Sequence, residues 1–215
     1  MRIAVVGIGN LGSALVEKLI GAGATPENLT LVHRAAAQHD ELGTRFGCRI
    51  VKSLPQLESH EIFDLLILAV KPQDAEGACR EIRAFIRSTT VVLSVMAGIT
   101  VARLSAMLGH GKIARAMPTL GAMVGESATT FFWSEALSHQ ECAAVEKVLS
   151  SCGRSWRVPR ENLIDVATAV AGSGPAYFCW LAEQLEAVAL ESGLSAEEAH
   201  QIIVQTLYGT ASYLK

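Results

Sequence analysis

The chain lacks any long uninterrupted run of apolar residues. Its longest such stretch, residues 62–70, is broken by Asp64 and has the length of a strand, whereas a membrane-spanning helix needs about 20 apolar residues. Arg2 is followed at once by a short apolar run and then by glycines, which argues against a secretory signal peptide. The sequence therefore predicts no membrane association.

Charge is also scarce. Charged residues make up 18% of the chain, the net charge is −3, and Lys and Arg form no basic stripe, which argues against a nucleic-acid partner. The five cysteines are scattered without any C-x-x-C pair, which is typical of reduced thiols in a cytoplasm. None of the six histidines has ligand spacing to another His or Cys, so the sequence predicts no metal site.

Apolar residues, by contrast, are abundant. They make up 50% of the chain, aromatics only 6%, and the mean hydropathy is +0.33. This is more apolar surface than one monomer core is expected to consume. Since large exposed apolar patches often mark protein interfaces, we expect a homodimer or a higher homo-oligomer.

Roughly the first 160 residues alternate strand-like and helix-like segments. The expected strands are residues 3–6, 29–33, 49–51, 63–70, 90–94 and 112–117. The expected helices are residues 13–22, 37–46, 74–86 and 101–108, with a short turn or helix at 54–57. Continuous apolar strands separated by helices imply a parallel sheet buried on both faces. The predicted fold is α/β, with a Rossmann-type domain over residues 1–160.

Strand signals stop near Glu161. Residues 161–192 have the composition of one very long helix, with Gly-Ser-Gly-Pro at 172–175 inside it. Ser195 and Glu198 form a capping box for a last helix that we expect to reach Lys215. Two helices cannot enclose a core alone. Residues 161–215 are therefore predicted to form an all-helical segment for dimerisation and substrate binding, packed on the first domain, on a second chain, or on both.

A glycine motif, Gly7-Ile8-Gly9-Asn10-Leu11-Gly12, follows the first strand and opens the first helix. Gly7 would permit a tight turn, Gly9 the approach of a pyrophosphate, and Gly12 close packing of helix on strand. Asn10 and Leu11 would place backbone N–H groups at the helix start, where phosphate binds. We interpret the motif as a dinucleotide site; the alternative is a glycine turn in an unrelated α/β fold.

The second strand ends in His33-Arg34, without the acidic residue that usually binds the ribose hydroxyls of NAD. The guanidinium of Arg34 suits a 2′-phosphate. We therefore expect NADPH to be preferred over NADH, although Arg34 could instead be a solvated loop residue. His33 could contact the adenine or ribose, or lie exposed in the loop.

Four further motifs follow later in the chain: "AVKP" at 69–72, "SVMAGIT" at 94–100, "RAMPT" at 115–119 and "AVAGSGPAYF" at 169–178. Together with the glycine motif, in order and approximate spacing over the whole chain, they resemble the pyrroline-5-carboxylate reductase family. The resemblance implies reduction of the cyclic imine 1-pyrroline-5-carboxylate to L-proline by hydride from NAD(P)H, as in proline biosynthesis.

The resemblance also implies site residues. Those beside the cofactor would be Ala69, Val70, Lys71 and Pro72, and those near the nicotinamide Ala97 and Gly98. Ser173, Gly174 and Pro175 would face the substrate. Proline is tolerated only in the first turn of a helix, so this stretch is expected to interrupt the long helix. Its N–H groups and the Ser173 hydroxyl could then hold the substrate carboxylate; alternatively, Ser173 is only an N-cap.

The chain departs from the family pattern in two places. Thr119 stands where the family usually has Asn, and the sequence ends before an "SPGGTT"-like segment that in relatives supplies a hydroxyl at the substrate and much of the dimer. The end is compatible with a truncated form or with a short paralogue. We expect these 215 residues to bind NADPH but to reduce pyrroline-5-carboxylate poorly. No side chain is an obvious general acid, so either the imine is protonated before it binds or the segment found in relatives supplies the proton donor.

The sequence leaves two other functions open. A β-hydroxyacid dehydrogenase would carry a catalytic lysine four residues after the second glycine of the G-S-G stretch, where this chain has Phe178. A non-catalytic NADP-binding sensor or regulator is motivated by Thr119 and by the end of the chain. Such a protein would bind NADPH without turnover.

Overall fold

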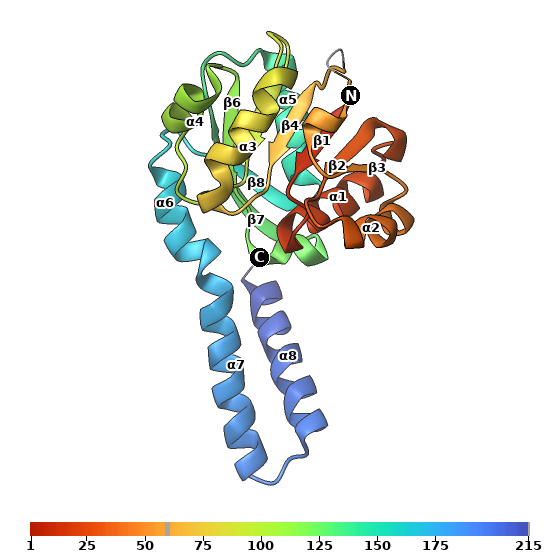
Figure 1. Cartoon of the computed structure of the whole chain (residues 1–215). Coiled ribbons are helices and arrows are strands. Elements are labelled where there is room, and N and C mark those ends of the chain that lie inside the picture. Colours follow the sequence, from red (N-terminus) through yellow and green to blue (C-terminus); the bar gives the residue numbers. More distant parts are fainter. Residues whose placement is uncertain (59–60, 215) are drawn as a thin grey trace. The chain divides into compact units, whose positions relative to one another are not determined.

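The computed structural model describes residues 1–58 and 61–214. It divides the chain into two compact units, Met1–Gly172 and Ser173–Lys215 (Figure 1). The division falls later in the chain than the boundary after residue 160 that the sequence suggested. Each unit is described below by itself.

The first unit is built on one sheet of eight strands in the order β3-β2-β1-β4-β5-β6-β7-β8 (Figure 1). The strands are β1 (Ile3–Val6), β2 (Leu29–Val32), β3 (Arg49–Val51), β4 (Leu65–Leu68), β5 (Val91–Ser94), β6 (Ile113–Met117), β7 (Ser127–Trp133) and β8 (Gly153–Arg157). Strands β1 to β6 are all parallel, β7 runs antiparallel to β6, and β8 is parallel to β7. The predicted Rossmann-like parallel sheet is confirmed.

Helices of the first unit are α1 (Asn10–Gly21), α2 (His39–Phe46), α3 (Ala75–Ile82), α4 (Val101–Leu108), α5 (His139–Ser150) and α6 (Leu163–Ala167). The helix expected over 74–86 is α3 flanked by 3-10 turns at Pro72–Asp74 and Arg83–Phe85, and a further 3-10 turn spans Leu54–Gln56. A π-helical turn, Thr168–Gly172, follows α6. Elements β7, α5 and β8 were not expected from the sequence.

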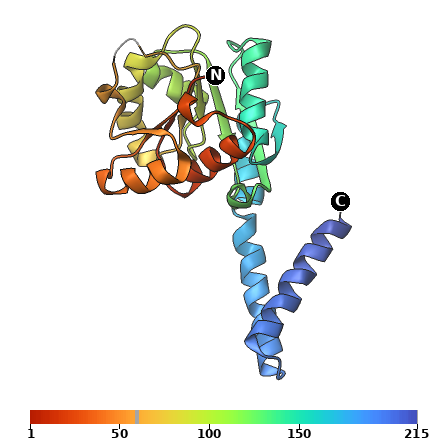
Figure 2. The ribbon, with the colours of Figure 1, turned by 90° about the vertical axis from the view of Figure 1, so that its right-hand side faces the viewer.

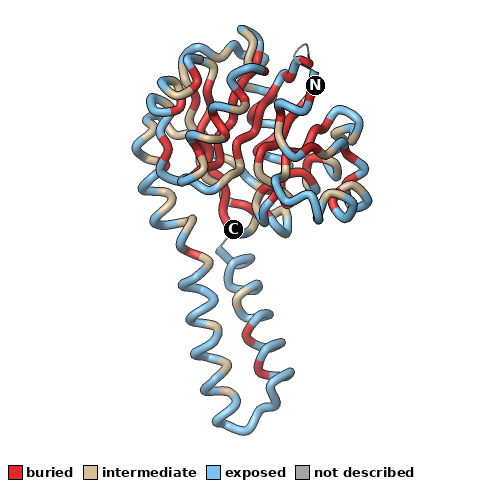
Figure 3. The backbone as a smooth tube through the Cα atoms, in the orientation of Figure 1, coloured by how far each residue is buried: buried red, intermediate tan, exposed pale blue. Residues whose placement is uncertain are grey.

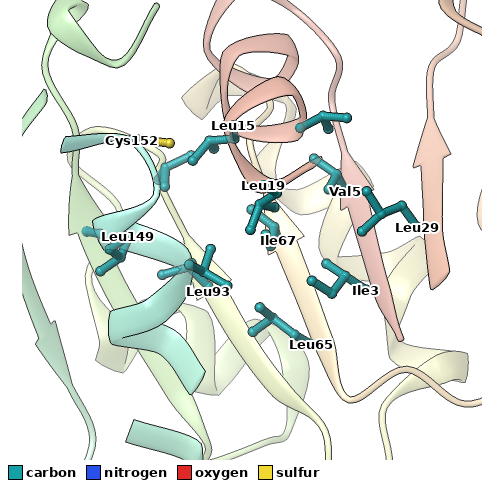
Figure 4. Close-up of a cluster of buried hydrophobic side chains, with 14 of the residues drawn as sticks. Ile3, Val5, Leu15, Leu19, Leu29, Leu65, Ile67, Leu93, Leu149 and Cys152 are labelled. Atoms are coloured by element: carbon teal, nitrogen blue, oxygen red, sulfur yellow. The ribbon is translucent and has the colours of Figure 1, made fainter. Parts of the chain in front are cut away.

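The sheet separates two apolar cores, because successive strand residues point to opposite faces. In β1, Ile3 and Val5 join the core under α1 and α5, whereas Ala4 and Val6 join the core under α3 and α4. Figure 4 shows the first core, with Leu15 of α1 directed toward it. Burial of such a side chain contributes about 1.5–3 kcal/mol, so packing on both faces stabilises the central strands of the sheet.

The second unit consists of α7 (Gly174–Glu191) and α8 (Ala196–Tyr213), which form an antiparallel pair joined by a short loop (Figure 2). The predicted capping box is present: the Ser195 hydroxyl accepts from the Glu198 N–H, and the Glu198 carboxylate accepts from the Ser195 N–H. Lys215, the predicted end of α8, lies outside the described residues. The stretch expected as one long helix is divided into α6, the π-turn and α7.

Most described residues of the second unit are exposed, as the colouring of the backbone in Figure 3 shows. They include large apolar groups: Tyr177, Phe178, Trp180, Val188, Ile202 and Tyr208 are each more than half exposed. Among the described residues, no helix is long and apolar enough to cross a membrane.

Candidate functional site

A groove of about 390 Å³ opens at the carboxyl ends of β1, β2 and β4. Strand order reverses here, because β1 pairs with β2 on one side and with β4 on the other, and open α/β sheets bind ligands at such a switch point. The groove is lined by Val6, Gly7, Ile8, Gly9, Val32, His33, Arg34, Ala69, Val70, Lys71, Gln73, Asp74, Ala78 and Glu81. It therefore brings together seven of the residues expected at the cofactor.

The three glycines of the motif differ in how much space an added Cβ would have. Gly7 has φ +100°, and a Cβ there would lie 2.7 Å from the carbonyl oxygen of Ala69. A Cβ on Gly12 would collide with the Gly7 backbone carbonyl. A Cβ on Gly9, in contrast, would meet no atom within 4 Å among the described residues. Gly7 and Gly12 are thus required by the fold itself, whereas Gly9 keeps open a space that faces the groove.

Helix α1 begins beside that space, with Asn10, Leu11 and Gly12 in its first turn. Its first intrahelical bond runs from the Ser13 N–H to the Gly9 carbonyl (2.8 Å). Within the described part of the chain, no side chain caps this end and no acidic residue lies in the first turn. The free N–H groups and the positive end of the helix dipole therefore suit a phosphate group. The residues present fit a dinucleotide.

The loop after β2 forms the far end of the groove. Nε2 of His39 donates to the carbonyl oxygen of His33 (2.6 Å), and Nδ1 of His33 lies 3.3 Å from the carbonyl oxygen of Ala35. The Arg34 guanidinium is exposed and lies 3.4 Å from the carboxylate of Asp74. Asp74 lines the groove although the sequence analysis did not select it, because it comes from the segment after β4 rather than from the end of β2.

Three of the other expected residues lie at the same edge of the sheet but outside the groove lining. Pro72 begins the 3-10 turn after Lys71. Ala97 and Gly98 are exposed in the loop between β5 and α4. Their placement near a nicotinamide stays a prediction.

An ion cluster of the first unit was also missed. Arg115 of β6 is 1% exposed, and its guanidinium lies 3.1 Å from Glu161 and 2.6 Å from Asp165 of the α6 region. Glu161 also accepts from the backbone N–H of Val101, at the start of α4. A charged residue inside the apolar strand "IARAM", and two acids four residues apart, were the available signals. The cluster ties α6 and α4 to the sheet.

Thr119, the departure from the family pattern, is buried and fully engaged. Its N–H donates to the Ser127 hydroxyl (2.9 Å), and its own hydroxyl accepts from the N–H of Ala128 (3.1 Å). The Ser127 hydroxyl lies 2.9 Å from that of Thr129. The Thr119 hydroxyl is therefore part of the contact between the loop after β6 and strand β7.

The predicted substrate stretch opens the second unit. Ser173 occupies the N-cap position of α7, is exposed, and makes no side-chain capping bond, while Pro175 lies in the first turn. Ser173 is thus at the N-cap position without capping through its hydroxyl, and its contact with a substrate stays a prediction. The π-turn before it is a distortion frequently found at functional sites. Elsewhere, in residues 1–58 and 61–214, no three His, Cys, Asp or Glu side chains are placed to hold a metal ion.

Comparisons with known proteins agree with this geometry. Residues 161–215 match the family model "Pyrroline-5-carboxylate reductase dimerisation", and residues 2–98 match "NADP oxidoreductase coenzyme F420-dependent". The chain is 33% identical to pyrroline-5-carboxylate reductase 1 of Bacillus subtilis over 99% of its own length and 72% of that protein.

Solved structures give the same result. The fold superposes on a pyrroline-5-carboxylate reductase from Coxiella burnetii with a TM-score of 0.89 and 28% identity, covering 98% of this chain and 78% of that one. The fold also superposes on the Plasmodium falciparum pyrroline carboxylate reductase with NADP bound, with a TM-score of 0.86 and 26% identity. The match covers 99% of this chain and 78% of that one. On its identity to the Bacillus subtilis enzyme across most of that enzyme's length, this chain belongs to the pyrroline-5-carboxylate reductase family.

Proposed function

We propose that the protein reduces 1-pyrroline-5-carboxylate to L-proline with NADPH. The observation that carries the proposal is the groove at the uncapped start of α1, kept open at Gly9, in a chain of this family. When bound, the reduced nicotinamide supplies a hydride to the carbon of the C=N bond. What this chain contributes is binding and orientation, and in a well-held complex these account for a large share of rate acceleration.

Cofactor binding is assigned to the first unit. The N–H groups at the start of α1 would hold the pyrophosphate, while Ala69, Val70 and Lys71 form the opposite wall. Arg34 would pair with the 2′-phosphate, which favours NADPH over NADH. The solved Plasmodium falciparum relative, which contains NADP, supports this choice.

Substrate binding is assigned to the start of α7. The exposed Ser173 hydroxyl and the N–H groups that follow it, with Gly174 and Pro175 setting the helix start, suit a carboxylate. A protonated imine accepts a hydride more readily than a neutral one. We assign no side chain as proton donor, and we infer that the iminium is formed before binding.

The assembly proposed is a homodimer built on α7 and α8. The exposed apolar side chains of these helices and the match of residues 161–215 to a dimerisation model both support it. The five unpaired cysteines suit a reducing compartment such as the cytoplasm.

The test is an assay of NADPH oxidation with 1-pyrroline-5-carboxylate, in which proline is quantified as the product. Stoichiometric proline formation is expected, with NADPH favoured over NADH. Turnover is expected to be slow; if NADPH binds tightly but no proline forms even after prolonged incubation, the protein is a binding module and the proposal is wrong.

A further inference from the structure

The only carboxylate that the described structure places against Arg34 comes from the opposite wall of the groove. Nη1 of Arg34 lies 3.4 Å from Oδ1 of Asp74, and side-chain exposures are 61% and 41%. Nη2 approaches α3, since a Cβ built on Gly77 would lie 3.6 Å from it. Asp74 itself makes no capping bond to α3. Its carboxylate is thus directed toward the guanidinium rather than toward its own helix.

This arrangement places opposite charges where the adenosine end of a dinucleotide is expected. Both residues line the groove, and the end of β2 offers no acid of its own. A 2′-phosphate would have to share the Arg34 guanidinium with Asp74, and it would also be repelled by that carboxylate. A ribose 2′-hydroxyl could instead donate a hydrogen bond to it, as to the acidic residue of NAD sites.

We propose that Asp74 is a specificity-determining residue, which lowers the preference for the 2′-phosphate by competing for Arg34. This rests on the proposed NADP site, but not on the identity of the imine substrate. Asp74 lies two residues after "AVKP", so the segment expected to contact the cofactor also carries the group that would set the choice between cofactors. NADH is accordingly retained as a usable second cofactor.

The size of the effect follows from the exposure of the pair. Asp74 occupies the guanidinium that the 2′-phosphate would use, and its charge also repels the phosphate directly; both effects are moderated because the pair is partly exposed to solvent. Removal of the Asp74 charge is therefore expected to tighten binding of 2′-phosphorylated cofactor by about tenfold. Binding of NADH should weaken or stay unchanged.

The experiment measures dissociation constants for NADPH and NADH by nucleotide fluorescence, and those for 2′-phospho-ADP-ribose and ADP-ribose by calorimetry. The variants are Asp74→Asn and, as a matched control, Glu76→Gln. Glu76 is an exposed acid on α3. It pairs with Arg103 (3.7 Å) and does not line the groove. In Asp74→Asn the ratio of the NADH to the NADPH constant should rise about tenfold; in Glu76→Gln it should not change.

A third variant, Arg34→Ala with Asp74→Asn, tests the competition. At least half of the gain in NADPH affinity, on a logarithmic scale, should disappear when Arg34 is absent. A change in the ratio below about threefold for Asp74→Asn, or a gain retained in full without Arg34, overturns the proposal. Failure of the imine reduction would leave these binding constants unaffected, so the two proposals fail separately.

Discussion

Gly9→Val is the substitution that most sharply separates cofactor binding from folding. Gly9 has φ −84° and ψ −162°, which any residue adopts, and its added Cβ meets no described atom within 4 Å. Valine is a poorer N-cap than glycine by up to about 1 kcal/mol, but it also restricts the unfolded chain by about 0.4–1 kcal/mol. The free energy of unfolding should therefore change by less than about 1 kcal/mol.

Cofactor affinity should change far more. The isopropyl group would fill the space through which the pyrophosphate reaches the N–H groups of α1. If two charge-assisted hydrogen bonds are lost, at about 1.5–3 kcal/mol each, NADPH affinity falls by roughly 100-fold or more. Fluorescence titration with NADPH and urea denaturation measure the two quantities on the same protein.

Two further glycines serve as controls. Gly21→Val is at the other end of α1, where an added Cβ also meets nothing within 4 Å, and it should change neither quantity appreciably. Gly7→Ala, at φ +100° and against the Ala69 carbonyl, should lose about 3 kcal/mol or more of stability. Normal NADPH titration by a folded Gly9→Val protein would refute the assignment of the glycine loop.

The remaining predictions concern stability and assembly. Glu161→Gln should lower the free energy of unfolding by roughly 2–4 kcal/mol, measured by urea denaturation, because it removes one of the two carboxylates paired with the buried Arg115; a change below about 0.5 kcal/mol would contradict this role. Burial alone would raise the pKa of Glu141, but hydrogen bonds from Lys112 and Ser138 outweigh it and hold that pKa below its ordinary value. Ionised Glu141 should contribute about 1 kcal/mol to the free energy of unfolding above pH 5. This contribution should be lost as the pH falls through the ordinary glutamate pKa and then through the lowered native pKa. The stabilities of the wild type and Glu141→Gln should therefore converge on acidification. Finally, sedimentation at micromolar concentration should show a dimer, and Trp180→Asp should shift it to monomer; a monomeric wild type would contradict the proposed interface.

Much of the first unit could be predicted because its signals are local. The apolar runs of β1, β4 and β5 are buried on both faces, so they stand out from the polar segments around them. Strand β7 was missed because Ser127 and Thr129 occupy its inward positions, where apolar residues would have signalled a strand. The Ser127 hydroxyl accepts from the Thr119 backbone N–H and lies within hydrogen-bond distance of the Thr129 hydroxyl. These bonds satisfy the buried hydroxyls, and a contact between positions eight residues apart has no signature in the sequence.

The residues of the groove could likewise be predicted from the sequence only in part. Gly7, Gly9 and Arg34 were accessible from the sequence, because a contiguous motif and the end of a strand identify them. Asp74 was not, since its role depends on a contact between segments 40 residues apart. Arg115 with Glu161 likewise joins positions 46 residues apart. Local pattern predicts which elements form, whereas charge pairs across the sheet depend on how those elements pack.

Following NADPH consumption and proline formation together, with 1-pyrroline-5-carboxylate as substrate, is the most direct test of the proposed imine reduction. We expect one proline to form per NADPH oxidised, and Ser173→Ala to raise KM for the imine more than it lowers kcat, as expected for a group that positions the substrate carboxylate. NADPH binding without proline formation, or a Ser173→Ala protein with unchanged KM, would contradict the proposal.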